Sequence, residues 1–113
     1  MFILGYIYNN FERIKTMLEI ENIANNQTFV TMPNGDRYFK SYNSWVARWI
    51  AEVDIVELDS HTWDYSRTTS KYLAKFLGVP CSKIRQKVNA NEYKLVNIKD
   101  AIRKIEIKDK WYN

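Results

Sequence analysis

Hydrophobic and polar residues are mixed in two short runs, TFVTM and RYFKS, and the turn sequence PNGD lies between them. The runs are rich in the aromatic and β-branched residues that are typical of strands. Asn34-Gly35 suits a tight turn, because both residue types readily adopt positive φ angles. The pattern therefore predicts that residues 28–41 form an antiparallel hairpin with a two-residue loop.

Apolar residues recur at helical spacing near both ends of the chain. Phe11, Ile14 and Leu18 follow two asparagines that can cap a helix, which predicts a helix near residues 10–22. Near the other end, YKLVN predicts a short strand. The following IKDAIRKI predicts a last helix, because its isoleucines recur at intervals of four and three residues.

The central stretch SWVARWIAEVDIVELD fits two patterns. Trp45, Val46 and Trp49 would share one face of a helix, yet Trp45, Ala47 and Trp49 would share one face of a strand. Residues 44–52 are open between helix and strand on this pattern alone. The β-branched run that follows predicts a strand at 53–58.

Residues 70–88, SKYLAKFLGVPCSKIRQKV, have the spacing of two helices joined by a sharp turn. Gly78 can adopt the left-handed conformation that begins such a turn, and Ser82 can cap the second helix. We expect helices near 68–77 and 82–89. Three apolar residues would pack inward: Leu73, Leu77 and Ile84.

The two expected helices resemble a DNA-binding helix-turn-helix. Their outward side chains would meet phosphates or base edges, and these are Lys83, Arg85, Gln86 and Lys87. The resemblance is incomplete, because Lys87 stands where a hydrophobic residue is expected. A second interpretation is that the two helices only pack on a sheet.

Together these elements predict an α+β fold. We expect a small antiparallel sheet, built as a meander of β-hairpins, with an N-terminal helix and a C-terminal helical, helix-turn-helix-like part. No repeat, low-complexity stretch or Pro/Gly/Ser-rich linker divides the chain, so residues 1–113 are expected to form a single domain.

Charge is unevenly distributed along the chain. Residues 1–65 carry five Lys or Arg against nine Asp or Glu, whereas residues 66–113 carry twelve against four. The basic half would attract phosphate or an acidic partner, or it would be an ordinary solvated surface.

Cys81 has no second cysteine to pair with, and the opening MFILGYIY is too short to cross a membrane. We expect a cytoplasmic protein without a membrane partner.

The residue types needed for catalysis meet only around the single histidine. His61 lies near Asp59, Asp64 and Ser66, as in an acid–base or nucleophilic site. Such residues also satisfy backbone groups in turns and cap helices. No spacing of ligands indicates a metal, and no glycine cluster indicates a phosphate-binding loop. We therefore expect no cofactor and no enzymatic activity.

The segment WDYSRTTSKY allows two interpretations. Its four hydroxyls at a helix start, with Arg67 and Lys71 beside them, could hold an anion. Alternatively, the hydroxyls cap the helix while Trp63 and Tyr65 anchor the core. Beyond this segment, the aromatic pair at 111–112 would form either a sticky tail or a cover that folds back on the sheet.

The succession PNGDRYF, SYNS and WDYSRTT, followed by a short basic tail, resembles a family of small uncharacterised proteins encoded by phages, prophages and mobile elements of Gram-positive bacteria. The resemblance covers roughly residues 27–98. In that family the segment after SYNS looks like a second hairpin with a glycine turn, which favours a strand at 44–52. Here IAEVD replaces the glycine turn.

That resemblance implies a small accessory protein that acts by binding. The expected role is an inhibitor of a host defence machine, of the anti-CRISPR type, which would block a Cas nuclease or its guide-RNA assembly. The partner would be a host protein or a ribonucleoprotein. The alternative is a helix-turn-helix-like DNA-binding regulator that uses the basic C-terminal half. Either partner would meet the same residues: Arg67, Lys71, Lys83, Arg85, Gln86 and Lys87.

Overall fold

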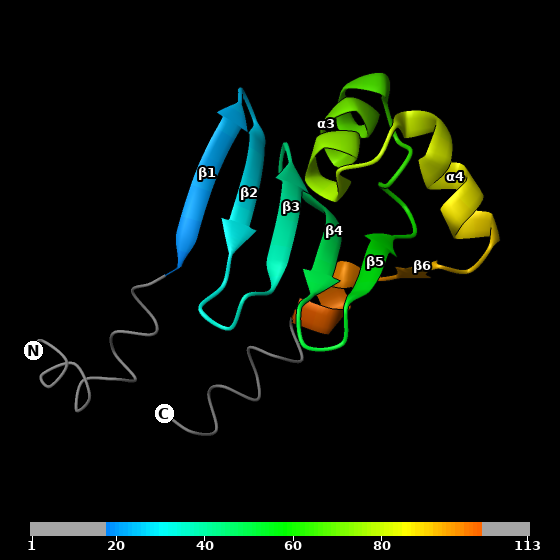
Figure 1. Ribbon diagram of the computed structural model, residues 1–113. Helices are drawn as coiled ribbons and strands as arrows, with labels where there is room; N and C mark the ends of the chain where they lie inside the picture. Colours follow the sequence, from blue (N-terminus) through cyan, green and yellow to red (C-terminus); the bar gives the residue numbers. More distant parts are fainter. Residues whose placement is uncertain (1–17, 103–113) are drawn as a thin grey trace, which may run out of the picture.

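The computed structural model describes residues 18–102, and these form a six-stranded sheet with helices on both faces (Figure 1). The strands follow one another across the sheet in chain order. They are β1 (Glu19–Ala24), β2 (Gln27–Thr31), β3 (Arg37–Ser41), β4 (Ser44–Ile50), β5 (Ile55–Asp59) and β6 (Tyr93–Val96). The labelled helices are α3 (Arg67–Leu77) and α4 (Cys81–Asn89), and residues 98–102 are also helical.

The sheet is mixed, so the predicted fold class is wrong. The strands from β1 to β5 pair antiparallel, but β6 pairs parallel with β5. A parallel pair needs a long crossover between its strands, and here α3 and α4 form that crossover. The two helices therefore lie between strands and do not make a separate C-terminal helical part.

The predicted helix at 10–22 is wrong over the described residues 18–22. The chain there forms β1, which pairs with β2 across a turn at residues 25–26. Asn26 has a positive φ of 63°, which asparagine tolerates better than most residues. Alternation is limited to Glu19, Ile20 and Glu21, so the sequence carries only a weak signal for this strand, and the helical spacing up to Leu18 concealed it. Residues 10–17 of the predicted helix lie outside the described residues.

The predicted hairpin at 28–41 is present, but its loop has three residues. Met32 and Asp36 close the loop, since the N–H of Met32 donates to the carbonyl of Asp36 at 2.8 Å and the N–H of Gly35 donates to the carbonyl of Met32 at 2.9 Å. Gly35 has a φ of 98°, whereas Asn34 is not among the residues with positive φ. Proline at position 33 favours this arrangement, a type I turn followed by a glycine bulge.

Residues 44–50 form β4, as the family resemblance predicted. The register against β3 shifts between Phe39 and Lys40, whose partners are Ala47 and Trp45. Val46 is the additional residue, and both Val46 and Ala47 are fully buried. A bulge of this kind breaks strict alternation, which explains why the sequence pattern was ambiguous. The next strand, predicted at 53–58, is β5 at 55–59.

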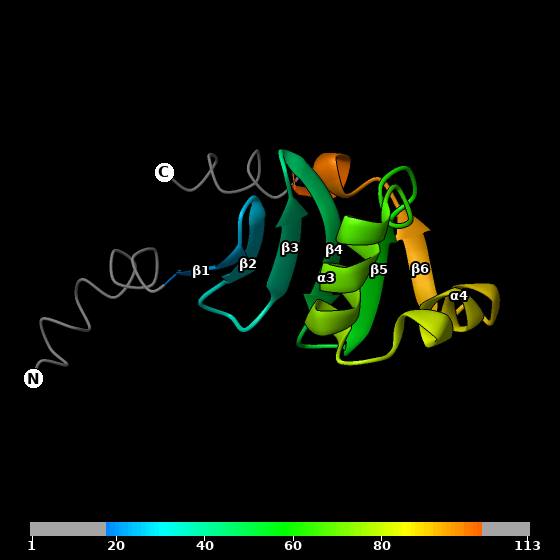
Figure 2. The ribbon, with the colours of Figure 1, turned by 90° about the horizontal axis from the view of Figure 1, so that it is seen from above.

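The main core lies between the sheet and α3 (Figure 2). Three aromatic rings meet there, with centroids of Phe29 and Phe39 at 5.5 Å and of Phe29 and Phe76 at 5.2 Å. Leu58 and Leu73 are fully buried against them. Contacts of this type between apolar side chains exclude water and supply most of the favourable free energy of folding.

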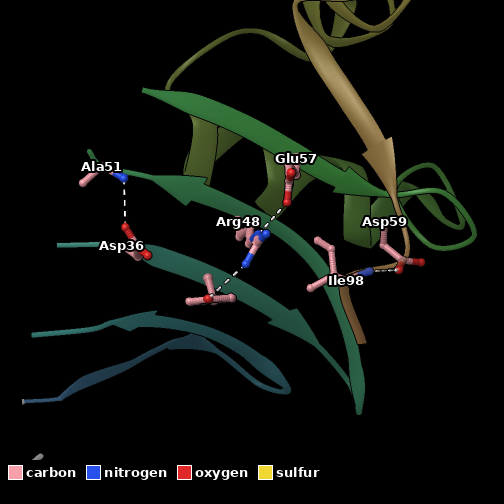
Figure 3. Close-up of polar contacts among 7 residues, drawn as sticks. Asp36, Arg48, Ala51, Glu57, Asp59 and Ile98 are labelled. Carbon is pink, nitrogen blue, oxygen red and sulfur yellow. Dashed lines mark hydrogen bonds and ion pairs between the residues drawn. The ribbon is translucent and has the colours of Figure 1, made fainter. Parts of the chain in front are cut away.

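The opposite face of the sheet carries an ion pair between Arg48 of β4 and Glu57 of β5 (Figure 3). Both side chains are largely covered, with 13% and 17% of their surface exposed. Burial alone would lower the pKa of Arg48, but hydrogen bonds to Glu57 and Tyr38 raise it, so the guanidinium stays charged. The same figure shows Asp36 accepting a hydrogen bond from the backbone N–H of Ala51, which joins two neighbouring turns.

Candidate interaction surface

Helix α3 begins after Ser66 because the side chain of this residue caps it. Ser66 has an extended backbone, and its Oγ accepts a hydrogen bond from the N–H of Thr69 at 3.1 Å. The Ser66 hydroxyl also donates to Thr69 Oγ1, which lies 3.2 Å from Oγ of the buried Ser41. The capping interpretation is confirmed for Ser66, and two of the four hydroxyls in this segment are already used inside the protein.

The two aromatic residues before α3 differ in their environment. Trp63 is buried and belongs to the core, as predicted. Tyr65 is 79% exposed, so its predicted role as a core anchor is wrong. Its backbone N–H closes a turn on the carbonyl of Thr62 at 3.2 Å, and this turn leaves the ring in solvent.

The connection from α3 to α4 contains the predicted glycine turn. Gly78 has a φ of 71° and ends α3, and its N–H donates to the carbonyl of Ala74 at 2.9 Å. Helix α4 begins at Cys81 with Pro80 as its N-cap and has no capping side chain. The predicted cap at Ser82 is therefore wrong, because the fixed φ of proline begins the helix earlier.

Two basic residues of α4 are held by carboxylates of the same chain. Arg85 Nη2 lies 2.8 Å from Asp64 Oδ2, and Lys87 Nζ lies 3.0 Å from Glu92 Oε2. The hydrogen bond to Glu92 raises the pKa of Lys87. The Arg85 guanidinium also lies 4.9 Å from the ring centroid of Trp63. Both side chains are oriented by these contacts, which reduces their freedom to meet another partner.

The remaining predicted residues of α4 face solvent. Lys83 and Gln86 are exposed, while Ile84 is buried in the core between them. Within residues 18–102, Lys83 has no carboxylate oxygen within 4.0 Å. Helix α4 therefore presents one cation that has no carboxylate partner in the described part of the chain, Lys83, where the sequence suggested three.

Helix α3 carries a basic stripe that consists of Arg67, Lys71 and Lys75. The three residues lie four positions apart and are all exposed. None of them forms an ion pair within the described part of the chain. The ammonium groups of Lys71 and Lys75 lie 5.3 and 5.4 Å from the ring centroid of Tyr72. Lys75 was missed in the sequence, although its position four residues after Lys71 was the signal.

The residues around His61 form a structural cluster. The buried Asp59 accepts hydrogen bonds through Oδ2 from the backbone N–H groups of His61 and Thr62, both at 3.1 Å. The hydroxyl of Thr62 donates to the carbonyl of Trp45 at 2.8 Å and lies 3.2 Å from the same Asp59 oxygen. His61 itself is exposed, and its Nδ1 lies 3.2 Å from the hydroxyl of Ser60. Asp59 thus organises a turn in this structure.

Two general classes of feature, a metal-binding cluster and a membrane-spanning helix, are absent from residues 18–102. No group of three or more His, Cys, Asp or Glu in this part of the chain is arranged to hold a metal ion. None of the helices there has the length and apolar content to cross a bilayer.

A known sequence family covers the part of the chain that holds β1 to β5 and the two crossover helices. Residues 18–92 match the model of a family of unknown function, DUF8033, and this is well over half of the 113 residues. The chain belongs to the DUF8033 family. No curated protein and no solved structure matches the chain.

The DUF8033 region contains β1 to β5, α3 and α4, and it ends one residue before β6 begins. It therefore includes every residue of the basic stripe and both ion pairs of α4. The region excludes β6 and helical residues 98–102.

Proposed function

We propose that this DUF8033 protein acts by binding, and that the basic stripe Arg67, Lys71 and Lys75 is its contact with an acidic surface of a partner protein. The observation that carries the proposal is the absence of any intramolecular carboxylate partner for these three cations within residues 18–102. Unpaired charges on one face of a helix steer association with an oppositely charged surface.

The state of α4 favours a protein partner over DNA readout. A recognition helix needs several side chains that are free to meet base edges. In α4, Arg85 and Lys87 are occupied by Asp64 and Glu92. A protein surface requires only charge complementarity together with exposed anchors such as Tyr65.

The class of partner follows from the sequence resemblance to proteins of phages and mobile elements. We infer a host defence nucleoprotein of the Cas type as the target, so the protein would inhibit it in the bacterial cytoplasm. An inhibitor of this kind needs no catalytic group, since it occupies a surface.

The test compares two triple variants with equal loss of charge. One is Arg67→Ala, Lys71→Ala, Lys75→Ala, and the other is Lys83→Ala, Arg85→Ala, Lys87→Ala. Each is used to capture proteins from nuclease-treated lysate of a Gram-positive host, across a series of salt concentrations. We expect wild-type protein to retain one defined protein complex, the α3 variant to lose most of it and the α4 variant to lose less.

Binding to random duplex DNA is measured with the same three proteins, to test whether the stripe contacts nucleic acid and not a protein. A steep loss of DNA binding with salt, abolished by the α3 variant, together with no protein captured after nuclease treatment, would show that the stripe contacts phosphate. Equal behaviour of wild type and both variants would show that the stripe is only a solvated surface.

A further inference from the structure

The face of the sheet opposite α3 contains an apolar groove of about 520 Å³. It extends from Trp45 of β4 across Val30 of β2 to Ile20 of β1, and Leu18 and Ile102 also line it. Ile20 is 62% exposed at its outer end. An apolar surface of this kind in contact with water is unfavourable, and it marks a place where another element binds.

Helical residues 98–102 already lie on this face of the sheet, on the side away from α3 (Figure 2). Ile98 is fully buried, and its backbone N–H donates to Asp59 Oδ1 at 3.1 Å. The N–H of Ala101 donates to the carbonyl of Asn97 at 3.1 Å. Four residues after Ile98, Ile102 contributes to the wall of the groove.

We propose that the groove is the docking site of the C-terminal segment of this chain, residues 103–113. The segment begins at the residue after Ile102, so it starts at the groove. Its apolar residues are Ile105, Ile107, Trp111 and Tyr112. Ile105 follows Ile102 by three positions and Ile98 by seven, which is the spacing of one helical face.

The length of the segment fits the groove. From β4 to β1 there are three strand spacings of about 4.8 Å, or roughly 14 Å. Residues 103–113 would span about 16 Å as a helix. The segment could therefore carry its aromatic pair to the exposed end of the groove at Ile20.

Other occupants have less support. Residues 1–17 also end at the groove, because Leu18 lines it, but they lead into the edge strand β1, whereas the helical residues 98–102 already lie across the sheet face and give residues 103–113 their direction. A second copy or a partner protein would have to compete with a segment that is covalently attached, whose effective concentration is far higher. The docking proposal is independent of the proposed function, because the basic stripe and the groove involve different residues.

Paramagnetic labelling tests the docking directly in the full-length chain. A nitroxide is attached to Tyr112→Cys in a Cys81→Ser background, and methyl signals are observed by NMR. We expect strong broadening for Ile20 and Val30 in the groove. Leu73 and Ile84, which are buried in the core on the α3 side, provide the matched control and should keep narrow signals.

Mixing the samples separates the alternatives. Protein that carries the nitroxide but no NMR isotope is mixed with isotope-enriched protein that carries no nitroxide. Docking within one chain predicts no broadening in this mixture. Broadening that appears only in the mixture would assign the groove to a second copy and overturn the proposal. Equal broadening of both sets of methyl groups, or none in either set, would overturn it as well.

A second measurement uses a dye that fluoresces on apolar surfaces. Ile105→Asp should raise dye fluorescence several-fold, because a carboxylate cannot enter the groove without a large desolvation cost. Lys110→Asp introduces the same carboxylate at a polar position five residues after Ile105, away from the apolar face of a helix, and should leave the signal unchanged. The same increase in both variants, or in neither, would contradict docking through the apolar side chains.

Discussion

The carboxylate of Asp59 accepts a hydrogen bond from the backbone N–H of Ile98, which lies 39 residues further along the chain (Figure 3). Asp59 ends β5, and Ile98 begins the helical residues after β6. The bond therefore joins the two parallel strands at the point where the crossover through α3 and α4 returns to the sheet. Asp59, which the sequence offered as part of a catalytic group, thus stabilises the connection between β5 and the segment after β6.

Replacement of Asp59 should destabilise the protein. Asp59→Ala removes the acceptor for the N–H groups of His61, Thr62 and Ile98, and a buried donor without a partner costs about 1–3 kcal/mol. We expect a loss of about 2–4 kcal/mol in the free energy of unfolding, measured with urea. Asp100→Ala, at an exposed position, should change it by less than about 0.5 kcal/mol. Equal stability of the two variants would contradict the assigned role of Asp59.

Substitution of Gly35 tests the three-residue loop. Gly35→Val should cost about 1 kcal/mol or more, because β-branched residues resist positive φ angles. An added Cβ would also lie 3.3 Å from the Cβ of Ala51, which is closer than usual. Gly35→Asn should cost less, since asparagine tolerates positive φ. Thermal unfolding measures both variants, and an unchanged melting temperature for Gly35→Val would be inconsistent with this loop.

The parts of the fold that the sequence predicted correctly are those with local signals. The proline-flanked turn at 33–35 and the glycine at 78 require particular backbone angles, so the hairpin and the two helices were found close to their true positions. Pairing between distant segments has no comparable local signal. The parallel alignment of β6 with β5 depends on the whole crossover, and the short sequence YKLV does not encode its direction.

For the candidate surface, too, local features could be predicted from the sequence and contacts between distant residues could not. Basic residues of α3 and α4 were recognised from composition and spacing, but their partners were not. Asp64 precedes Arg85 by 21 residues, and only the folded chain brings them within 2.8 Å. Arg85 is paired with Asp64 and Lys87 with Glu92, so we expect the partner to contact the basic stripe on α3 and not α4.

His61 and Cys81 should be dispensable. Both are exposed, and in the described part of the chain the side chain of each makes one hydrogen-bond contact, His61 with Ser60 and Cys81 with the carbonyl of Ser70 at 3.5 Å. His61→Ala and Cys81→Ser are therefore expected to change the free energy of unfolding by less than about 0.5 kcal/mol. They should also leave capture of the host complex intact. Loss of capture in either folded variant would indicate chemistry at that residue.

Stability should fall at alkaline pH in a way that depends on Tyr93. Burial in β6 raises the pKa of its hydroxyl above the ordinary value of 10.0, although the positive charge of Lys87 partly opposes this. As the pH rises, the unfolded chain then loses this proton before the folded protein does. The contribution of Tyr93 is complete below about pH 10 and is lost above it.

Tyr93→Phe isolates this contribution. Urea unfolding of wild type and variant is compared from about pH 8, where the hydroxyl is protonated in both states, to about pH 11. We expect the free energy of unfolding to fall more steeply for the wild type than for Tyr93→Phe, because the variant has no proton to lose at this position. Tyr65→Phe is the matched control, since its ring is 79% exposed, and its curve should parallel that of the wild type. Parallel curves for the wild type and Tyr93→Phe would show that β6 does not shield the hydroxyl from water.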